Sequence, residues 1–348
     1  MLDKLRGTSL RRRLIIVFFA QTGMQEAGID SGGLLREFLA ELCSRAFSPD
    51  FGLFSRTDDG LLFPNPSSGL AHQGTDHFRL FELLGTMLGK AVFEGICIDE
   101  TFAPFFLGAL RGRQQFFHVT DDLRQLDADV HRSLTYLRNA DDVEALGLTF
   151  TITRNGLGEA EEVELVPNGR NVAVSAFNKF NYIQRVAKHY IVDRIAPQTQ
   201  AFVRGFHAVV PPSTLQAFSE PELQLLLSGS IAGIDVADMR RHAQYAGGYH
   251  ALDRHVRRLW EVLGSFTQEE LSLFLQFVTS SRRASTGGFG SLSPPLTIVR
   301  VPIRRDEDKL PVGRTCFNQI LWPTYPNARV ARAKLLLAIT SGAGFDLS

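Results

Sequence analysis

The chain has 348 residues, enough for two or three compact units that each bury a hydrophobic core. Lysine plus arginine and aspartate plus glutamate number 37 each, so no strong net field indicates binding to nucleic acid or to a membrane surface. The three cysteines are odd in number and far apart. This spacing argues against a disulfide framework and a structural zinc site, and it indicates a reducing intracellular compartment.

The first apolar segment, 11–20 (RRRLIIVFFA), resembles the charged and apolar parts of a signal peptide. Its apolar run is far shorter than the roughly 20 residues that span a membrane. β-branched and aromatic residues favour a buried strand instead, and the basic run 11–13 is typical of a solvated patch. We therefore expect a strand here.

A helix is expected next, with Asp30 as its N-cap. Its apolar stripe consists of Leu34, Leu35, Phe38, Leu39 and Leu42. The glycines at 28, 32 and 33 are typical of a turn before that helix.

The segment 85–90, GTMLGK, superficially resembles a phosphate-binding loop. It is one residue short, and no serine or threonine follows the lysine. We expect its two glycines to permit close helix packing, with nucleotide binding as the alternative. The run 81–110 is read as apolar helical sequence that belongs to a core.

Aspartates punctuate short apolar segments from about residue 120. Two β-type runs, 164–166 and 172–174, flank Asn168-Gly169, which predicts a hairpin with a type I′ turn. A helix over about 176–195, closed by Pro197, is expected to follow.

The segment 228–233, SGSIAG, has the small-residue composition of a hinge. Beyond it we predict a helix through Leu252 and Leu263 and, after a capping box at Thr267–Glu270, a second helix. A surface loop over 280–295, a strand over 296–303, and a final helix over about 328–341 with Gly342 as C-cap complete the chain.

A short polar loop, LPVGRTCFN at 310–318, presents Cys316 between two apolar runs. Pro311 and Gly313 are expected to hold this loop out of regular structure, with the thiol near the surface. Arg314 is an adjacent cation that favours the thiolate, and Thr315 is a hydrogen-bonding neighbour. Cys43 and Cys97 lie in apolar runs, where a cysteine behaves as a small hydrophobe. From these local features alone, an inert and a reactive Cys316 both remain open.

Several motifs in the same order resemble HECT-type ubiquitin-protein ligases. The loop LPVGRTCFN, the final helix and the ending GFDLS resemble the C-terminal lobe of that family. The strings MQEAGIDSGG (24–33), REF (36–38), PNPSS (64–68) and LGKA (88–91) resemble its amino-terminal lobe. PELQLLLSG, AGGYH and the GFDLS ending are most similar to the ubiquitin-protein ligase subgroup lettered B and C.

The resemblance implies an α+β, bilobal HECT fold. A larger, mostly helical N-lobe would comprise residues 1–230, with a small subdomain at about 119–196 that docks the ubiquitin-conjugating enzyme. A hinge at 231–234 would lead to a smaller α/β C-lobe at 235–348. Cys316 would accept ubiquitin as a thioester and pass it to substrate lysines, with Arg314 as a modest electrostatic aid and Thr315 beside it.

Positions matching the family's apolar docking groove are Val130, Leu134, Leu146, Leu148, Tyr182 and Val186. An ordinary subdomain core is the alternative, because Tyr182 and Val186 at i, i+4 simply share a helix face. Phe345 resembles a position that anchors the C-terminal tail by apolar packing. Asp346 is a candidate for helping to deprotonate the acceptor amine, with a solvated terminal charge as the alternative.

The implied partners are a ubiquitin-charged conjugating enzyme, ubiquitin and protein substrates, with neither nucleic acid nor membrane. No cofactor and no metal are expected, and the compartment would be the cytoplasm or the nucleus. Two alternatives stay open. A cysteine hydrolase acting on ubiquitin conjugates would need a histidine and an orienting Asn or Asp near Cys316. A non-catalytic interaction scaffold would need neither.

Overall fold

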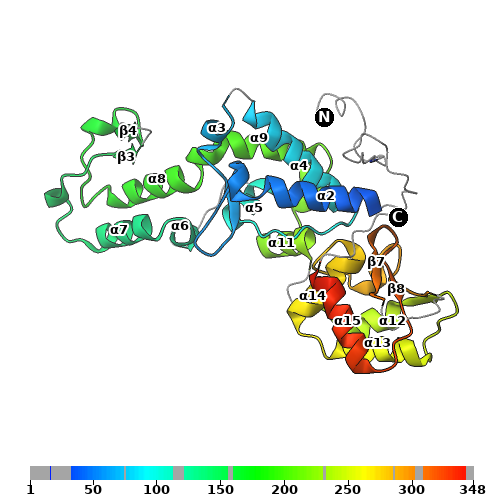
Figure 1. The fold of residues 1–348 in the computed structure, drawn as a ribbon. Coiled ribbons are helices and arrows are strands. Elements are labelled where there is room, and N and C mark those ends of the chain that lie inside the picture. Colours follow the sequence, from blue (N-terminus) through cyan, green and yellow to red (C-terminus); the bar gives the residue numbers. More distant parts are fainter. Residues whose placement is uncertain are drawn as a thin grey trace.

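The computed structural model describes residue 16 and residues 33–73, 76–112, 121–155, 160–229, 233–284, 287–301 and 309–341. These residues form an α+β, two-lobed molecule (Figure 1). Three separate clusters of buried apolar side chains underlie the arrangement: one within 35–227, one within 123–192 and one within 234–339. The first two belong to the larger, mostly helical N-lobe and its subdomain, and the third belongs to the C-lobe.

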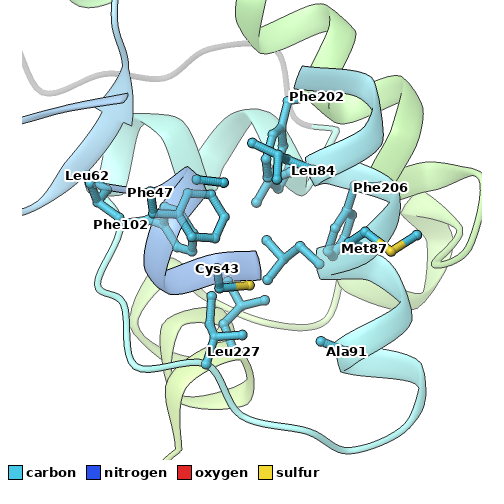
Figure 2. Close-up of a cluster of buried hydrophobic side chains, with 14 of the residues drawn as sticks. Cys43, Phe47, Leu62, Leu84, Met87, Ala91, Phe102, Phe202, Phe206 and Leu227 are labelled. Carbon is cyan, nitrogen blue, oxygen red and sulfur yellow. The ribbon is translucent and has the colours of Figure 1, made fainter. Parts of the chain in front are cut away.

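The main body of the N-lobe is helical, with one short antiparallel strand pair. Its elements are α2 (Gly33–Ala46), β1 (Phe54–Arg56), β2 (Leu62–Pro64), α3 (Ser68–Ala71), α4 (His77–Phe93), α5 (Pro104–Leu110), α9 (Ala196–His207), α10 (Pro212–Leu215) and α11 (Glu220–Ser228). Helix α2 buries Leu35, Leu39 and Cys43, with Phe38 and Leu42 partly buried against the same core. The predicted stripe is therefore confirmed except for Leu34, which is only half-buried and does not belong to this cluster. Figure 2 shows that core, where Cys43, Phe47 and Phe102 meet side chains of α4 and α9.

Helices α4 and α9 pack with their backbones in close approach. A Cβ atom at Gly85 would overlap the carbonyl oxygen of Phe202, and one at Gly205 would overlap that of Glu82. The close-packing interpretation of the GTMLGK segment is therefore confirmed. Lys90 is fully buried and paired with Glu94, so this segment does not offer the exposed amine of a phosphate-binding loop.

One expectation for the N-lobe body is wrong in part. The run 81–110 is not one helical stretch, because α4 ends at Phe93 and α5 begins at Pro104. Gly95 lies between them at φ +66°, a left-handed conformation that ends a helix at little steric cost. Phe102 lies in the intervening segment and is nevertheless buried, as is Phe106 in α5.

The subdomain projects from the far end of the N-lobe (Figure 1). Its elements are α6 (Asp121–Leu126), α7 (Ala128–Asn139), β3 (Thr151–Asn155), β4 (Ala160–Glu164) and α8 (Lys179–Ile191). The hairpin pairs β3 with β4, so its predicted position at 164–174 is wrong. Asn168 does adopt φ +60°, but Gly169 opens a 3₁₀ turn over Gly169–Asn171 instead of completing a type I′ turn.

The helix expected over 176–195 is shorter in the structure. Helix α8 ends at Ile191, and a 3₁₀ turn over Asp193–Ile195 leads directly into α9. Pro197 lies in the first turn of α9, where its missing N–H costs nothing, and it therefore starts a helix instead of closing one.

The C-lobe combines a mixed sheet with four helices among its described residues. Its elements are α12 (Val236–His242), β5 (Gln244–Ala246), α13 (Arg254–Gly264), α14 (Gln268–Thr279), β6 (Thr297–Arg300), β7 (Val312–Arg314), β8 (Gln319–Trp322) and α15 (Ala328–Thr340). The strand order is β5-β6-β8-β7, with β5, β6 and β8 parallel and β7 antiparallel to β8. The capping box at Thr267 and Glu270 is present at the start of α14, as predicted.

Two C-lobe expectations need correction. Leu252 lies before α13 and is 77% exposed, so it is not part of that helix's apolar face. The loop 280–295 is not uniformly a surface loop, since Phe289 is buried in the C-lobe core.

Some predictions concern residues outside the described ranges. These are the strand at 11–20 apart from Ile16, which packs against the N-lobe core, the N-cap Asp30, the C-cap Gly342 and the tail residues Phe345 and Asp346. The predicted hinge at 231–234 is described only at Gly233 and Ile234.

Candidate functional site

Cys316 lies at the tip of the β7–β8 hairpin. Strand β7 pairs with β8 through Val312↔Leu321, Gly313↔Ile320 and Arg314↔Gln319, and a 3₁₀ turn over Thr315–Phe317 joins them. The side chain of Cys316 is partly exposed, and the cysteine is not disulfide-bonded. The expectation that Pro311 and Gly313 keep this region out of regular structure is wrong, because Gly313 lies within a strand.

Gly313 is required by space and not by its backbone angle. A Cβ atom there would overlap the carbonyl oxygen of Phe277 in α14, so only glycine lets β7 lie against that helix. Because β7 carries the cysteine turn, this close approach sets how far Cys316 stands from the lobe's core.

Asn318 closes the turn from the other side. It is fully buried and adopts φ 50° and ψ 48°, a left-handed conformation that asparagine tolerates better than most residues. Its side-chain Nδ2 donates to the Pro294 carbonyl at 2.6 Å, and its backbone carbonyl accepts from the Thr297 backbone N–H at 2.9 Å. The turn that carries Cys316 is therefore tied to the start of β6.

A cation from the N-lobe reaches this turn. Arg36, in α2, donates from Nη1 to Asn318 Oδ1 at 2.6 Å and from Nη2 to the Ser293 carbonyl at 3.2 Å. Burial lowers the pKa of Arg36, while the electrostatic influence of Cys97 and Cys316 raises it. Arg36 is thus close enough to Cys316 for the two charges to interact, although the residues are 280 positions apart in the sequence.

The other two cysteines occupy different surroundings. Burial raises the pKa of the Cys43 thiol to about 12, with the negative charge of Glu100 acting in the same direction. Cys97 is half-buried beside a cavity of about 40 Å³ that Arg36, Arg283 and Phe289 also line, where the lobes meet. Burial raises the pKa of Cys97, opposed by the positive charges of Arg36 and Arg283.

The structure places the neighbours of Cys316 in distinct roles. Arg314 is exposed at the end of β7, while Thr315 is partly buried and its carbonyl accepts from the Asn318 N–H.

Two C-lobe histidines are engaged elsewhere. His242 bonds to Asp238, and the His255 ring accepts from Arg254 in a site close to Trp322. These contacts do not resemble the cysteine–histidine pair that a hydrolase requires.

The six groove positions divide by exposure. Leu134, Tyr182 and Val186 are buried in the subdomain core, where Tyr182 stacks edge-on against Phe150. Val130 and Leu148 are partly buried against the same core, and Leu146 is 38% exposed. Five of the six positions belong to one cluster or pack against it, and Leu146 does not. Only Val130, Leu148 and Leu146 offer surface to a partner in this state.

Two features escaped the sequence reasoning. Arg36 carried no local signal, because its partners lie in the other lobe. Phe177 and Phe180 lie beside the rim of the subdomain core and are 100% and 59% exposed. Their segment is held next to Leu146 by bonds from the Ala176 N–H to Glu144 and from Lys179 to the Ala140 carbonyl. The available signal was a pair of phenylalanines, at 177 and 180, among polar residues at the start of the predicted helix.

Two kinds of feature are absent from the described ranges. No helix there is both long and apolar enough to cross a bilayer. In the same residues, histidine, cysteine and acidic side chains do not gather in a group of three or more that could hold a metal ion.

Comparison with known proteins gives a consistent result. Residues 40–348 match the model of the HECT-domain (ubiquitin-transferase) family. The chain is 38% identical over 351 residues to E3 ubiquitin-protein ligase UPL6 of Arabidopsis thaliana, covering 100% of this chain and 34% of that protein. It is 37% identical over 374 residues to Ubiquitin-protein ligase E3B of Homo sapiens, covering 100% and 35%.

A more distant relative is E3 ubiquitin-protein ligase HACE1 of Danio rerio, 33% identical over 350 residues, with 98% of this chain and 37% of that protein covered. The chain spans about a third of the length of these curated relatives. Both the two-lobed fold and the family match extend over almost all of the described residues, and the chain therefore belongs to the HECT-domain family of ubiquitin transferases.

Proposed function

We propose that this chain accepts ubiquitin from a conjugating enzyme as a thioester on Cys316 and transfers it to lysine side chains of protein substrates. The observation that carries the proposal is the position of Cys316, partly exposed at the tip of a hairpin in a chain of the HECT family. Cys43, with its buried thiol, does not offer an equivalent nucleophile.

The chemistry consists of two acyl transfers. The Cys316 thiolate attacks the carbonyl carbon of the thioester between ubiquitin and the conjugating enzyme, and the thiolate of that enzyme leaves. A neutral lysine amine then attacks the new thioester, forms an isopeptide bond and loses a proton as the Cys316 thiolate leaves. The first transfer exchanges one thioester for another, so it needs little driving force. The second is downhill.

Positioning contributes more to the rate than the charge beside the sulfur. Lowering a thiol pKa from about 8.5 to about 7.5 raises the thiolate fraction at pH 7 roughly eightfold. The same change lowers nucleophilicity about threefold, so the net gain is only about two- to threefold. Holding the reactants in the correct geometry supplies up to about 7–11 kcal/mol. The exposed Arg314 is accordingly a modest aid in this proposal.

The subdomain is the proposed docking site of the conjugating enzyme. Its accessible apolar surface, which we call the docking rim, comprises Val130, Leu146, Leu148, Phe177 and Phe180. Leu134, Tyr182 and Val186 support this rim from beneath. Exposed aromatic side chains amid aliphatic ones are typical of binding hot spots. The tail roles of Phe345 and Asp346 remain predictions.

The test is a single-turnover reaction with ubiquitin-charged conjugating enzyme. The protein should form a ubiquitin adduct that a thiol reagent cleaves, and Cys316→Ala should abolish it. Cys97→Ala is the matched control, because it removes the other partly exposed sulfur and should leave the adduct intact. An adduct that survives Cys316→Ala would refute the proposal. Cleavage of ubiquitin conjugates would indicate a hydrolase, and neither activity would indicate a scaffold.

A further inference from the structure

The first contact between the lobes joins α2 to the cysteine turn. The guanidinium of Arg36 bridges Asn318 Oδ1 and the Ser293 carbonyl, two groups that belong to different loops of the C-lobe. Asn318 in turn donates to Pro294. One N-lobe side chain thus fixes both the turn that carries Cys316 and the loop that precedes β6.

The second contact is an ion-pair cluster nearer the junction of the lobes. Asp99 of the N-lobe forms ion pairs with two C-lobe arginines, Arg283 at 3.3 Å and Arg282 at 3.8 Å. Arg282 is held in place by its own lobe, since its Nε donates to Gln276 at 2.9 Å. The side chains of Arg283 and Asp99 are 28% and 47% exposed, so this pairing is reversible and sensitive to salt.

Both contacts hold Cys316 away from the docking rim. Figure 1 shows the C-lobe against the end of α2, with the subdomain of α7, α8, β3 and β4 at the opposite end of the molecule. The turn that carries Cys316 packs directly against α2. A carrier docked on the subdomain therefore cannot meet this sulfur until the C-lobe leaves α2.

We propose that Arg36 and Asp99 form a two-point latch that holds the C-lobe with Cys316 against α2. Release of this latch limits the rate at which Cys316 accepts ubiquitin. The inference rests on the proposed function, because it assigns a step to that reaction. Arg36 acts here as a positioning residue. Its contacts with Asn318 and Ser293 set the orientation of the cysteine turn while the C-lobe lies against α2.

The test removes one latch point at a time and measures two quantities. Arg36→Gln and Asp99→Asn each abolish a charge, and Arg45→Gln is the matched control. Arg45 lies on the same helix α2, but it is exposed and pairs with Glu41 four residues earlier on that helix. Small-angle X-ray scattering reports the separation of the lobes. A single-turnover assay with ubiquitin-charged conjugating enzyme reports the rate of adduct formation on Cys316.

We expect both latch variants to show a larger radius of gyration and adduct formation about two- to fivefold faster, the range that a partly exposed charge pair supports. Arg45→Gln should match the unaltered protein in both measurements. Asp99→Asn is the decisive variant, because it leaves Arg36 beside Cys316. Because both arginines pair with Asp99, the charge exchange Asp99→Arg with Arg282→Asp and Arg283→Asp should restore the compact scattering profile and the slower rate, which a merely misfolded variant would not do.

An unchanged scattering profile in Asp99→Asn overturns the latch. A larger radius with an unchanged or slower adduct rate also overturns it, because the docked arrangement would then not be the state that delays acceptance. If the unaltered protein forms no adduct at all, the proposed function fails, whereas the scattering comparison still shows whether Arg36 and Asp99 hold the lobes together.

Discussion

Burial distinguishes the three cysteine thiols of this protein. Cys43 is 4% exposed inside the N-lobe core, surrounded by side chains such as Phe47 and Leu227 (Figure 2). Transfer of a charged thiolate into such surroundings is unfavourable, which is why the pKa of Cys43 rises to about 12. Cys316 shares the residue type but lies in a partly exposed turn.

At the residue scale we predict selective alkylation. At pH 8 the Cys43 thiol stays protonated, because burial raises its pKa to about 12. Brief treatment of the folded protein with iodoacetamide should therefore label Cys316 and spare Cys43, as read by peptide mass spectrometry. The control is the urea-unfolded chain, in which both should react at similar rates. Labelling of Cys43 as fast as Cys316 in the folded protein would contradict the assignment.

At the scale of elements, close backbone approach determines how the helices pack. Helices α4 and α9 meet through Gly85 and Gly205, where each glycine faces a carbonyl oxygen of the opposite helix. Gly313 does the same for β7 against α14. In each case the sequence uses glycine because no side chain fits, and the helix or strand can then lie near enough to bury its neighbours.

Gly205→Ala should lower the free energy of unfolding by about 3 kcal/mol or more, because the added methyl group must push two backbones apart. Gly264→Ala is the control: it lies in α13 with open space around the added Cβ, and it should change stability by less than about 1 kcal/mol. Urea-unfolding curves followed by circular dichroism measure both. Equal effects of the two substitutions would show that helix propensity, and not the close approach of the two backbones, determines the change in stability.

At the scale of the whole molecule, the subdomain with the docking rim and the C-lobe with Cys316 lie at opposite ends (Figure 1). In the proposed function, capture of the conjugating enzyme can therefore be tested separately from chemistry on the sulfur. Phe177 and Phe180 are exposed, so replacing them removes little from the protein's own core.

Phe177→Ser and Phe180→Ser should each weaken binding of the conjugating enzyme about tenfold, as loss of an aromatic hot spot does, with little change in thermal stability. Isothermal titration calorimetry measures the affinity. Leu337→Ser is the control, since Leu337 is 52% exposed on α15 of the C-lobe and should leave binding unchanged. Full affinity in both phenylalanine variants would show that the conjugating enzyme binds at another surface.

Local patterns predicted the features that depend on neighbours in the sequence. The apolar stripe of α2, the capping box of α14 and the final helix α15 follow from residues within one or two turns. The predicted hairpin at 164–174 was wrong because strand pairing does not depend only on neighbouring residues. Asn168 adopts the left-handed conformation that a hairpin turn needs, yet the partner strand of β4 is β3, upstream in the chain. Strand pairing is a tertiary choice that turn residues alone do not make.

The sequence by itself determined the family, the two-lobed α+β class and Cys316 as the candidate nucleophile, because motif order and residue type are properties of the chain. Only the tertiary structure revealed Arg36 beside Asn318 and Asp99 beside Arg283. These partners lie far apart in the chain and in different lobes. Their charges therefore come together only where the two lobes, each with its own core, pack against each other.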